Sequence, residues 1–208
     1  IKIVDRVSEH WNIYNADTNT LLKYDIENKP GISNLLTIYA ALKEISIEDI
    51  RHQEEICAEI CREVTADGKQ HLAMVDTYGC QQNEADSEKI RGYLAEMGCG
   101  FTDDEFKADI IVVNTCAVRE HAEMRVFGNV GQLNHSKKEN PAQIIAVCGC
   151  MVQQEHMAEK IKKSYPVVDL VFGPHELWRF PELLQYVLKT NKRIFAAEDS
   201  AGNIAEGI

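Results

Sequence analysis

The sequence predicts an α/β fold: an open, mainly parallel sheet with helices on both faces, preceded by a partly helical N-terminal extension. Four runs are continuously apolar, as strands buried on both faces are, and they lie at 71–79, 108–115, 143–149 and 168–173. Stretches of helical character follow them at 83–98, 117–140, 152–166 and 175–190. Such alternation is typical of a parallel sheet, and right-handed crossovers would place the carboxyl end of every strand at one edge.

We expect three segments along the chain, which are an N-terminal extension at 1–70, the α/β domain at 71–190 and a linker at 191–208. In the extension, apolar residues recur at helical spacing over 35–50 and 47–64, which predicts two helices. Ser46, with Asp49 three positions later, has the pattern of a capping box, so the second helix should begin there. Because the sequence starts at Ile1 rather than Met and ends in a loosely patterned stretch, we expect it to be a piece of a longer protein.

The composition indicates a reduced, cytoplasmic protein. The seven cysteines are odd in number and not densely spaced, and a chain of 208 residues with 45% hydrophobic content does not need disulfides to fold. No apolar run near the start has the length of a signal peptide or membrane span, so no membrane partner is expected. The net charge of −11 lacks the excess of Lys and Arg with which a stand-alone nucleic-acid binder neutralises phosphates. Any nucleic acid would therefore be held mainly by other parts of the protein.

Three cysteines occupy the same position in three successive strand–helix units. Cys80, Cys116 and Cys150 each follow a predicted strand and precede a helix, so we expect the three thiols to meet at one edge of the sheet. A helix N-terminus stabilises a thiolate, which is the form that binds metal. The alternative, that they are small buried residues, fits one cysteine better than three in equivalent positions. Coordination of a metal is therefore the favoured interpretation.

The pattern does not choose between zinc and an iron–sulfur cluster, both of which thiolates favour. A structural zinc would need a fourth ligand, and His175 follows the fourth predicted strand at the same edge. A cubane cluster held by three cysteines would instead leave one iron open to an external sulfur species or a substrate.

The other four cysteines are interpreted as structural. Cys148 lies inside a predicted strand as an apolar filler, and Cys99 lies in a turn between glycines. Cys57 and Cys61 are four residues apart on a predicted helix and belong to its apolar side. They do not begin a C-x-x-x-C-x-x-C motif, because Val64 stands at the third position.

Polar residues beside the three cysteines allow two interpretations each. Asn83 is expected to cap the helix after Cys80, with Asp86 answering from three residues on. Residues around Cys116 could face the cleft and contact a ligand or a nucleotide, or could be solvated residues of a helix start; they are Asn114, Arg119 and Glu120.

Two glycines precede candidate ligands. Gly79 and Gly149 would allow a bulky cofactor to approach the backbone, although tight turns would need them as well. No Gly-rich phosphate loop follows any predicted strand, which weakens ordinary nucleotide binding, and no Ser/His/Asp arrangement stands out. No catalytic residue is therefore assigned.

Four motifs in order give the chain a specific resemblance; they are "TYGCQQNEADSEKI", "ADIIVVNTCAVREHAEMRVFGNVG", "NPAQIIAVCGCMVQ" and "YPVVDLVFGPHEL". Over residues 71–190 the chain resembles the N-terminal domain of the methylthiotransferases, which are radical S-adenosylmethionine enzymes. The stretch "NTCAVREHAE" resembles the branch that makes 2-methylthio-N6-isopentenyladenosine beside the tRNA anticodon. The alternatives are the branches that act on threonylcarbamoyl-adenosine in tRNA or on a ribosomal-protein aspartate. Gln82 and the pair Pro174–His175 depart from the usual family residues and do not affect the cysteines.

The resemblance implies that Cys80, Cys116 and Cys150 hold a [4Fe–4S] cluster whose fourth iron site supplies or carries sulfur. It also implies a second [4Fe–4S] cluster and S-adenosylmethionine on a following domain, toward which residues 191–208 would lead, and a C-terminal domain that grips the tRNA. No such domains lie within these 208 residues. The competing hypothesis is a non-enzymatic α/β module that binds zinc or a nucleotide.

Overall fold

The structure is a computed structural model that describes residues 45–66, 68–116, 120–196 and 205–206, together with 33, 36–38, 40 and 41. The chain separates into two units, residues 1–56 and 57–208, each of which is described by itself. The helices are α3 (Ile47–Thr65), α4 (Gln81–Glu96), α5 (Glu120–Glu139), η1 (Cys150–Gln153), α6 (Glu155–Ser164), η2 (Leu177–Arg179) and α7 (Phe180–Thr190). The strands are β1 (Leu72–Tyr78), β2 (Gly100–Phe101), β3 (Ile110–Thr115), β4 (Ile144–Gly149), β5 (Leu170–Phe172), β6 (Ile194–Ala196) and β7 (Ala205–Glu206).

The strands form one sheet in the order β2-β1-β3-β4-β5-β6-β7. All neighbouring pairs from β2 to β6 are parallel, and β7 is antiparallel to β6. The predicted α/β class with a mainly parallel sheet is therefore confirmed. The sequence pattern missed β2, β6 and β7, which span only two or three residues each.

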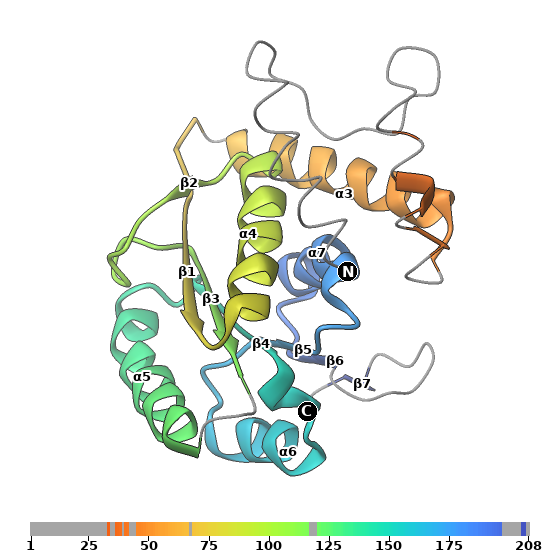
Figure 1. Ribbon diagram of the computed structural model, residues 1–208. Coiled ribbons are helices and arrows are strands. Elements are labelled where there is room, and N and C mark those ends of the chain that lie inside the picture. Colours follow the sequence, from red (N-terminus) through yellow and green to blue (C-terminus); the bar gives the residue numbers. More distant parts are fainter. Residues whose placement is uncertain are drawn as a thin grey trace. The chain divides into compact units, whose positions relative to one another are not determined.

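Helices cover both faces of the sheet, as predicted (Figure 1). On one face, α5 and α6 pack against alternate residues of the central strands to form a buried cluster that includes Ile111, Val113, Ile145, Val147, Phe127, Val130, Met157 and Ile161. On the other face, α4 lies on β1 and α7 lies on β5. The apolar side chains buried there include Val112, Ala146, Leu170, Ile90, Leu94 and Leu183. Every residue of β3, β4 and β5 is buried, which is why these strands are apolar without alternation, whereas β1 is partly exposed.

The register aligns the carboxyl ends of the three central strands. Tyr78 at the end of β1 pairs with Thr115 at the end of β3, and Thr115 pairs with Gly149 at the end of β4. These three residues therefore lie in a row across the sheet. Whatever follows them along the chain emerges at the same edge, which we call the carboxyl edge.

In the N-terminal unit, the predicted helix start at Ser46 is confirmed. The Ser46 backbone N–H donates to Asp49 Oδ2 at 2.8 Å, and the Asp49 N–H donates to Ser46 Oγ at 3.0 Å, which is a capping box. Residues 36–38 and 40–41 are helical, within the first predicted helix. The proposed domain boundary at residue 70 stays a prediction. In the part of the chain that the structure describes, no helix is both long and apolar enough to span a bilayer.

Candidate metal centre at the carboxyl edge

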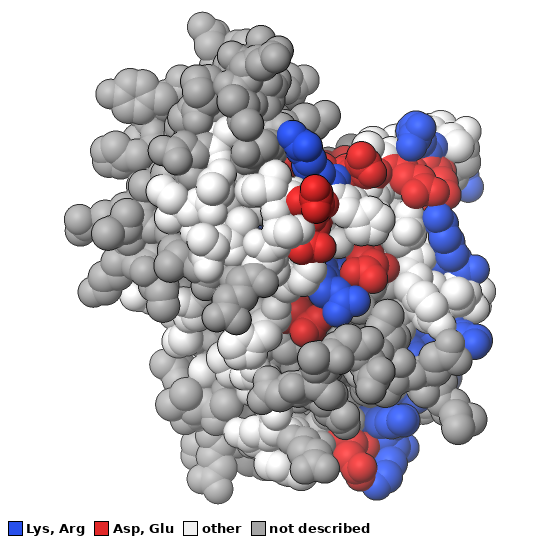
Figure 2. Space-filling model, turned by 90° about the vertical axis from the view of Figure 1, so that its right-hand side faces the viewer, with Lys and Arg blue, Asp and Glu red and all other residues white. Residues whose placement is uncertain are grey.

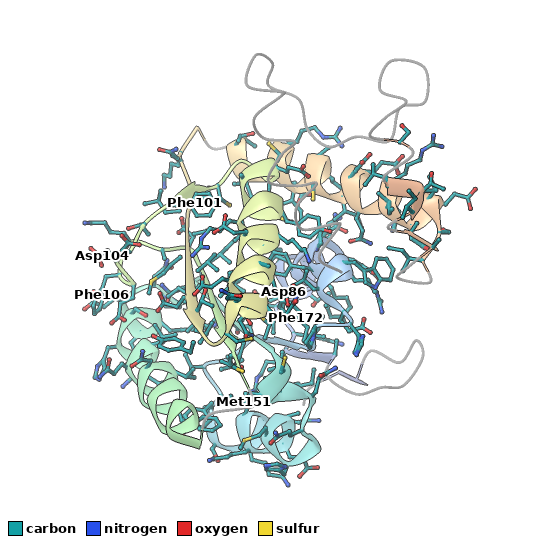
Figure 3. All side chains as sticks on the ribbon, in the orientation of Figure 1. Asp86, Phe101, Asp104, Phe106, Met151 and Phe172 are labelled. Atoms are coloured by element: carbon teal, nitrogen blue, oxygen red, sulfur yellow. The ribbon has the colours of Figure 1, made fainter. Side chains whose placement is uncertain are left out.

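The three predicted cysteines all lie at the carboxyl edge. Cys80 follows β1 as the N-cap residue of α4, Cys116 comes directly after β3, and Cys150 is the first residue of η1 after β4. The Cys116 backbone N–H donates to the Tyr78 carbonyl at 3.0 Å, which ties the end of β3 to the end of β1. Figure 3 shows Met151, the neighbour of Cys150, at this edge, whereas Phe101 lies well away from it. The predicted convergence of the three positions is confirmed.

The three sulfurs differ in their surroundings. Cys80 is exposed, Cys150 is partly exposed and Cys116 is buried. The backbone N–H groups of Asn83 and Gln82 donate to the Cys80 sulfur and, with a hydrogen bond from the Cys116 thiol, hold the pKa of Cys80 below its usual value. Cys80 is therefore the thiol best prepared to bind as a thiolate.

Cys150 does not gain the same benefit. Burial raises the pKa of Cys150, and the nearby sulfurs of Cys116 and Cys80 raise it further when they are charged. The helix that it begins, η1, has only four residues and contributes little dipole. The expectation that a helix N-terminus would help every one of the three thiols is thus wrong for Cys150. The electrostatic effect of Cys116 and Cys80 on the pKa of Cys150 nevertheless shows that its sulfur lies near the other two.

The donor set suits a soft metal centre, although the metal-free arrangement is open. Thiolates are the ligands that zinc and iron–sulfur clusters take. Among the described residues, no three His, Cys, Asp or Glu side chains are already arranged closely enough to hold a metal ion. His175 is exposed beyond β5 and completes no such group. Because metal binding commonly organises its own loops, loading would have to draw the three thiols together.

Asn83 has a different role from the predicted cap. Cys80 is the N-cap of α4, and Asn83 is its third helical residue. The Asn83 Oδ1 accepts from the Cys80 backbone N–H at 3.2 Å and from its thiol at 3.3 Å. The Asn83 Nδ2 donates to Asn114 Oδ1 at 3.0 Å and to the Thr115 carbonyl at 3.1 Å. Asp86 does not take the predicted part in the cap, because its carboxylate accepts hydrogen bonds from the side chains of Gln82 and Lys89 instead.

Asn114 fits neither of the two interpretations proposed from the sequence. It is 1% exposed and does not face a cleft or solvent. Its Nδ2 donates to the Asn83 carbonyl at 2.8 Å and to Ser87 Oγ at 3.0 Å, and Ser87 also accepts from Thr77 at 2.8 Å. Arg119 lies outside the described residues, as does the Glu120 side chain.

Both glycines at this edge are required by the protein itself. Gly149 has φ of 100°, and a Cβ there would stand 2.2 Å from the Thr115 carbonyl oxygen. A Cβ on Gly79 would stand 2.3 Å from Asn83 Oδ1. Gly149 forms a tight turn, and Gly79 leaves room for the buried amide. Close approach of a cofactor is not needed to explain either residue.

The four remaining cysteines lie where the sequence placed them. Cys148 is 1% exposed inside β4, and burial raises its pKa. Cys99 is 8% exposed in the loop after α4, and burial raises its pKa to about 11. Cys57 and Cys61 lie on α3, the first fully buried and the second partly. Burial disfavours the thiolate form that binds metal, which sets Cys148 and Cys99 apart from Cys80.

Sequence reasoning missed the polar residues that join the strand ends. Thr77, Ser87 and Thr115 are hydrogen-bonded between strands or between strand and helix, and Ser87 and Thr115 are fully buried. A signal was present in the sequence, because Asn114 and Thr115 end an otherwise apolar run. Buried polar groups almost always have partners, so such a pair at a strand end predicts a network.

Comparison with known proteins identifies a family model and several enzymes to which this chain is similar. Residues 72–173 match the family described as "Uncharacterized protein family UPF0004". The chain is 44% identical over 168 residues to the tRNA-2-methylthio-N(6)-dimethylallyladenosine synthase of Clostridioides difficile, covering 79% of this chain and 35% of that protein. The enzyme of the same name from Clostridium tetani is 51% identical over 134 residues, covering 64% of this chain and 30% of that protein.

The matched region contains the candidate centre. It begins with β1 and ends just after β5, so it includes Cys80, Cys116, Cys150 and the polar residues that connect their strands. The chain spans about a third of the length of the curated relatives it matches. The chain is thus similar, through residues 72–173, to the family described as UPF0004, and it is similar to the tRNA-2-methylthio-N(6)-dimethylallyladenosine synthases of these bacteria.

Proposed function

We propose that this chain is the iron–sulfur-binding domain of a tRNA methylthiotransferase. The complete protein would add a methylthio group to C2 of N6-isopentenyladenosine next to the anticodon. Cys80, Cys116 and Cys150 would hold a [4Fe–4S] cluster on this domain. A second [4Fe–4S] cluster and S-adenosylmethionine would belong to a following domain, and the tRNA would be bound mainly by other domains. The names of the relatives favour the isopentenyladenosine branch over the two other branches of the family.

The observation that carries this proposal is the convergence of three cysteines at the ends of three adjacent parallel strands inside the family region. Their strand ends are aligned in register, so the three loops leave the sheet side by side. A cluster bound there would supply an iron site that no protein sulfur occupies, where a sulfur species can be held. The chain's own part is to bring three thiols to one edge of the sheet: the pKa of Cys80 is lowered, and Cys116 is held to the end of β1.

The setting would be a reducing one, as in the cytoplasm. None of the seven cysteines forms a disulfide in the structure, and three of them would have to remain thiols or thiolates until a cluster is inserted. An oxidising compartment would favour disulfides between the neighbouring thiols at the carboxyl edge.

Anaerobic reconstitution with iron and sulfide tests the proposal. A [4Fe–4S] protein is brown, with broad visible absorbance and about four iron and four sulfide ions per chain. A zinc module would be colourless and would bind zinc in preference to assembling a cluster. A chain that remains colourless after reconstitution while binding one equivalent of zinc would reverse the choice between these two functions.

These 208 residues by themselves are expected to neither cleave S-adenosylmethionine nor bind tRNA tightly. They contain no C-x-x-x-C-x-x-C, and their net charge is −11. On the face in Figure 2, basic side chains are interspersed with acidic ones, and the described residues of that face form no broad basic surface. Affinity for phosphates comes largely from Lys and Arg, so the dissociation constant should be no tighter than about 1 μM at physiological salt.

The measurement uses the reconstituted 208-residue chain with reductant, S-adenosylmethionine and an isopentenylated anticodon stem-loop. We expect no 5′-deoxyadenosine above that of a protein-free control. Appreciable 5′-deoxyadenosine, or nanomolar binding of the stem-loop, would show that the division of labour between domains is different.

A further inference from the structure

A continuous path of hydrogen bonds, partly buried at Cys80 and fully buried beyond Asn83, connects the three strands that end at the candidate centre. It starts at Cys80, whose backbone N–H and thiol both donate to the Asn83 amide oxygen. It continues through the Asn83 Nδ2 to Asn114 and to the Thr115 carbonyl on β3. From there the Thr115 hydroxyl donates to the Cys148 carbonyl on β4 at 2.7 Å. The loops that carry the three candidate ligands are thus joined through side chains as well as through the sheet.

Asn83 is the residue of this path whose hydrogen bonds no substitution could reproduce. A side-chain amide offers two donor hydrogens and an oxygen with two lone pairs, and Asn83 uses all four in the metal-free chain. Only the bond from the Cys80 thiol needs the proton that metal binding would remove; the bonds with the Cys80 backbone N–H, Asn114 and Thr115 do not. The Asn83 oxygen faces an N–H and an S–H, whereas its nitrogen faces two oxygens. If the amide were flipped, its N–H groups would face the backbone N–H of Cys80, and its oxygen would face the oxygens of Asn114 and Thr115. The orientation of the amide is therefore unique. Because Asn83 is only 1% exposed, water cannot replace a lost partner.

We propose that Asn83 is a positioning residue that holds Cys80 and Cys116 in register for metal binding. The proposal rests on the proposed function, since it takes both cysteines to be ligands. The two cysteines are 36 positions apart in the sequence, and ordering two separate loops at the moment of loading would weaken the binding of the metal. Hydrogen bonds that order both loops before the metal binds remove that part of the entropic cost of binding. Groups that orient metal ligands commonly contribute about 10- to 100-fold to metal affinity.

The test is anaerobic titration of the metal-free chain with cobalt(II), whose spectrum reports thiolate ligands. Asn83→Leu keeps the branched shape and the number of side-chain heavy atoms and removes the whole amide, so cobalt(II) affinity should fall by about 10- to 100-fold, with a weaker thiolate charge-transfer band. Gln143→Met is the matched control. Gln143 is also 1% exposed and donates to the Glu105 and Ala108 carbonyls at 2.8 and 2.7 Å, but it lies at the opposite end of β4. Its loss should lower the melting temperature without changing cobalt(II) affinity or the spectrum.

A second variant covers the case in which Asn83→Leu does not fold. Gly79→Ala keeps every polar group, but its Cβ would come within 2.3 Å of Asn83 Oδ1 and displace the amide. It should therefore weaken cobalt(II) binding by about tenfold while the chain stays folded.

Wild-type affinity in a folded Asn83→Leu or Gly79→Ala chain would overturn the positioning role alone. Equal weakening by Gln143→Met would overturn it too, because the effect would then be general destabilisation. A wild-type chain that binds no cobalt(II) would instead remove the metal site, and the positioning role with it.

Discussion

Replacing Cys80, Cys116 or Cys150 by alanine is expected to abolish stable loading of the iron–sulfur cluster. Each variant would leave two protein ligands in place of three, and two anchors do not hold a cluster against iron chelators. The nearest other thiol, Cys148, is 1% exposed inside β4 and is held protonated by burial, so it cannot substitute. Iron and sulfide would be measured after anaerobic reconstitution and passage over a desalting column.

The matched controls for these variants are Cys57→Ala, Cys61→Ala and Cys99→Ala. All three cysteines lie away from the carboxyl edge, on α3 or in the loop after α4, and should leave iron and sulfide content nearly unchanged. Cys57→Ala and Cys99→Ala should lower stability by about 1 kcal/mol, since each removes a buried sulfur. Full loading of any variant in the first group would contradict the assignment of ligands.

Gly149→Ala is expected to cost both stability and cluster loading. Its φ of 100° and ψ of −172° lie in a region that is essentially restricted to glycine. The added Cβ would also stand 2.2 Å from the Thr115 carbonyl oxygen and 2.5 Å from Asn114 Oδ1. We expect the free energy of unfolding to fall by roughly 3 kcal/mol or more, measured by urea denaturation of the metal-free chain. Loading should fail as well, because the strained turn leads directly into Cys150.

Gly92→Ala is the control for that substitution. Gly92 lies inside α4, and a Cβ there would meet no atom within 4 Å. Alanine in a helix interior is favoured over glycine, so this variant should be more stable by about 0.5–1 kcal/mol and load normally. A Gly149→Ala chain as stable as the wild type would mean that the turn before Cys150 can relax without cost.

The fold was predictable because its main strands carry a strong local signal. The runs that became β3, β4 and β5 are mainly apolar and are buried at every residue, and β1 is apolar over its first four residues although it is only partly buried. The parallel arrangement then follows from the helices between them, and the convergence of three cysteines follows from the parallel arrangement. None of these steps required knowledge of a contact between residues distant in the sequence.

The details of the candidate centre depended on such contacts. The partners of Asn83 are 31 and 32 positions away on β3, so its sequence neighbourhood suggested only a local cap. The need for glycine at 149 likewise comes from Thr115 on the adjacent strand.

The amino-acid sequence by itself determined the α/β class, the order of the main elements and which three cysteines share an edge, because periodicity and chain connectivity are local properties. Only the tertiary structure decided which polar groups join those cysteines and how each thiol ionises. Hydrogen bonding and burial depend on what the folded chain brings together. Cys80 and Cys150 therefore occupy equivalent places in the sequence pattern, yet their pKa values shift in opposite directions.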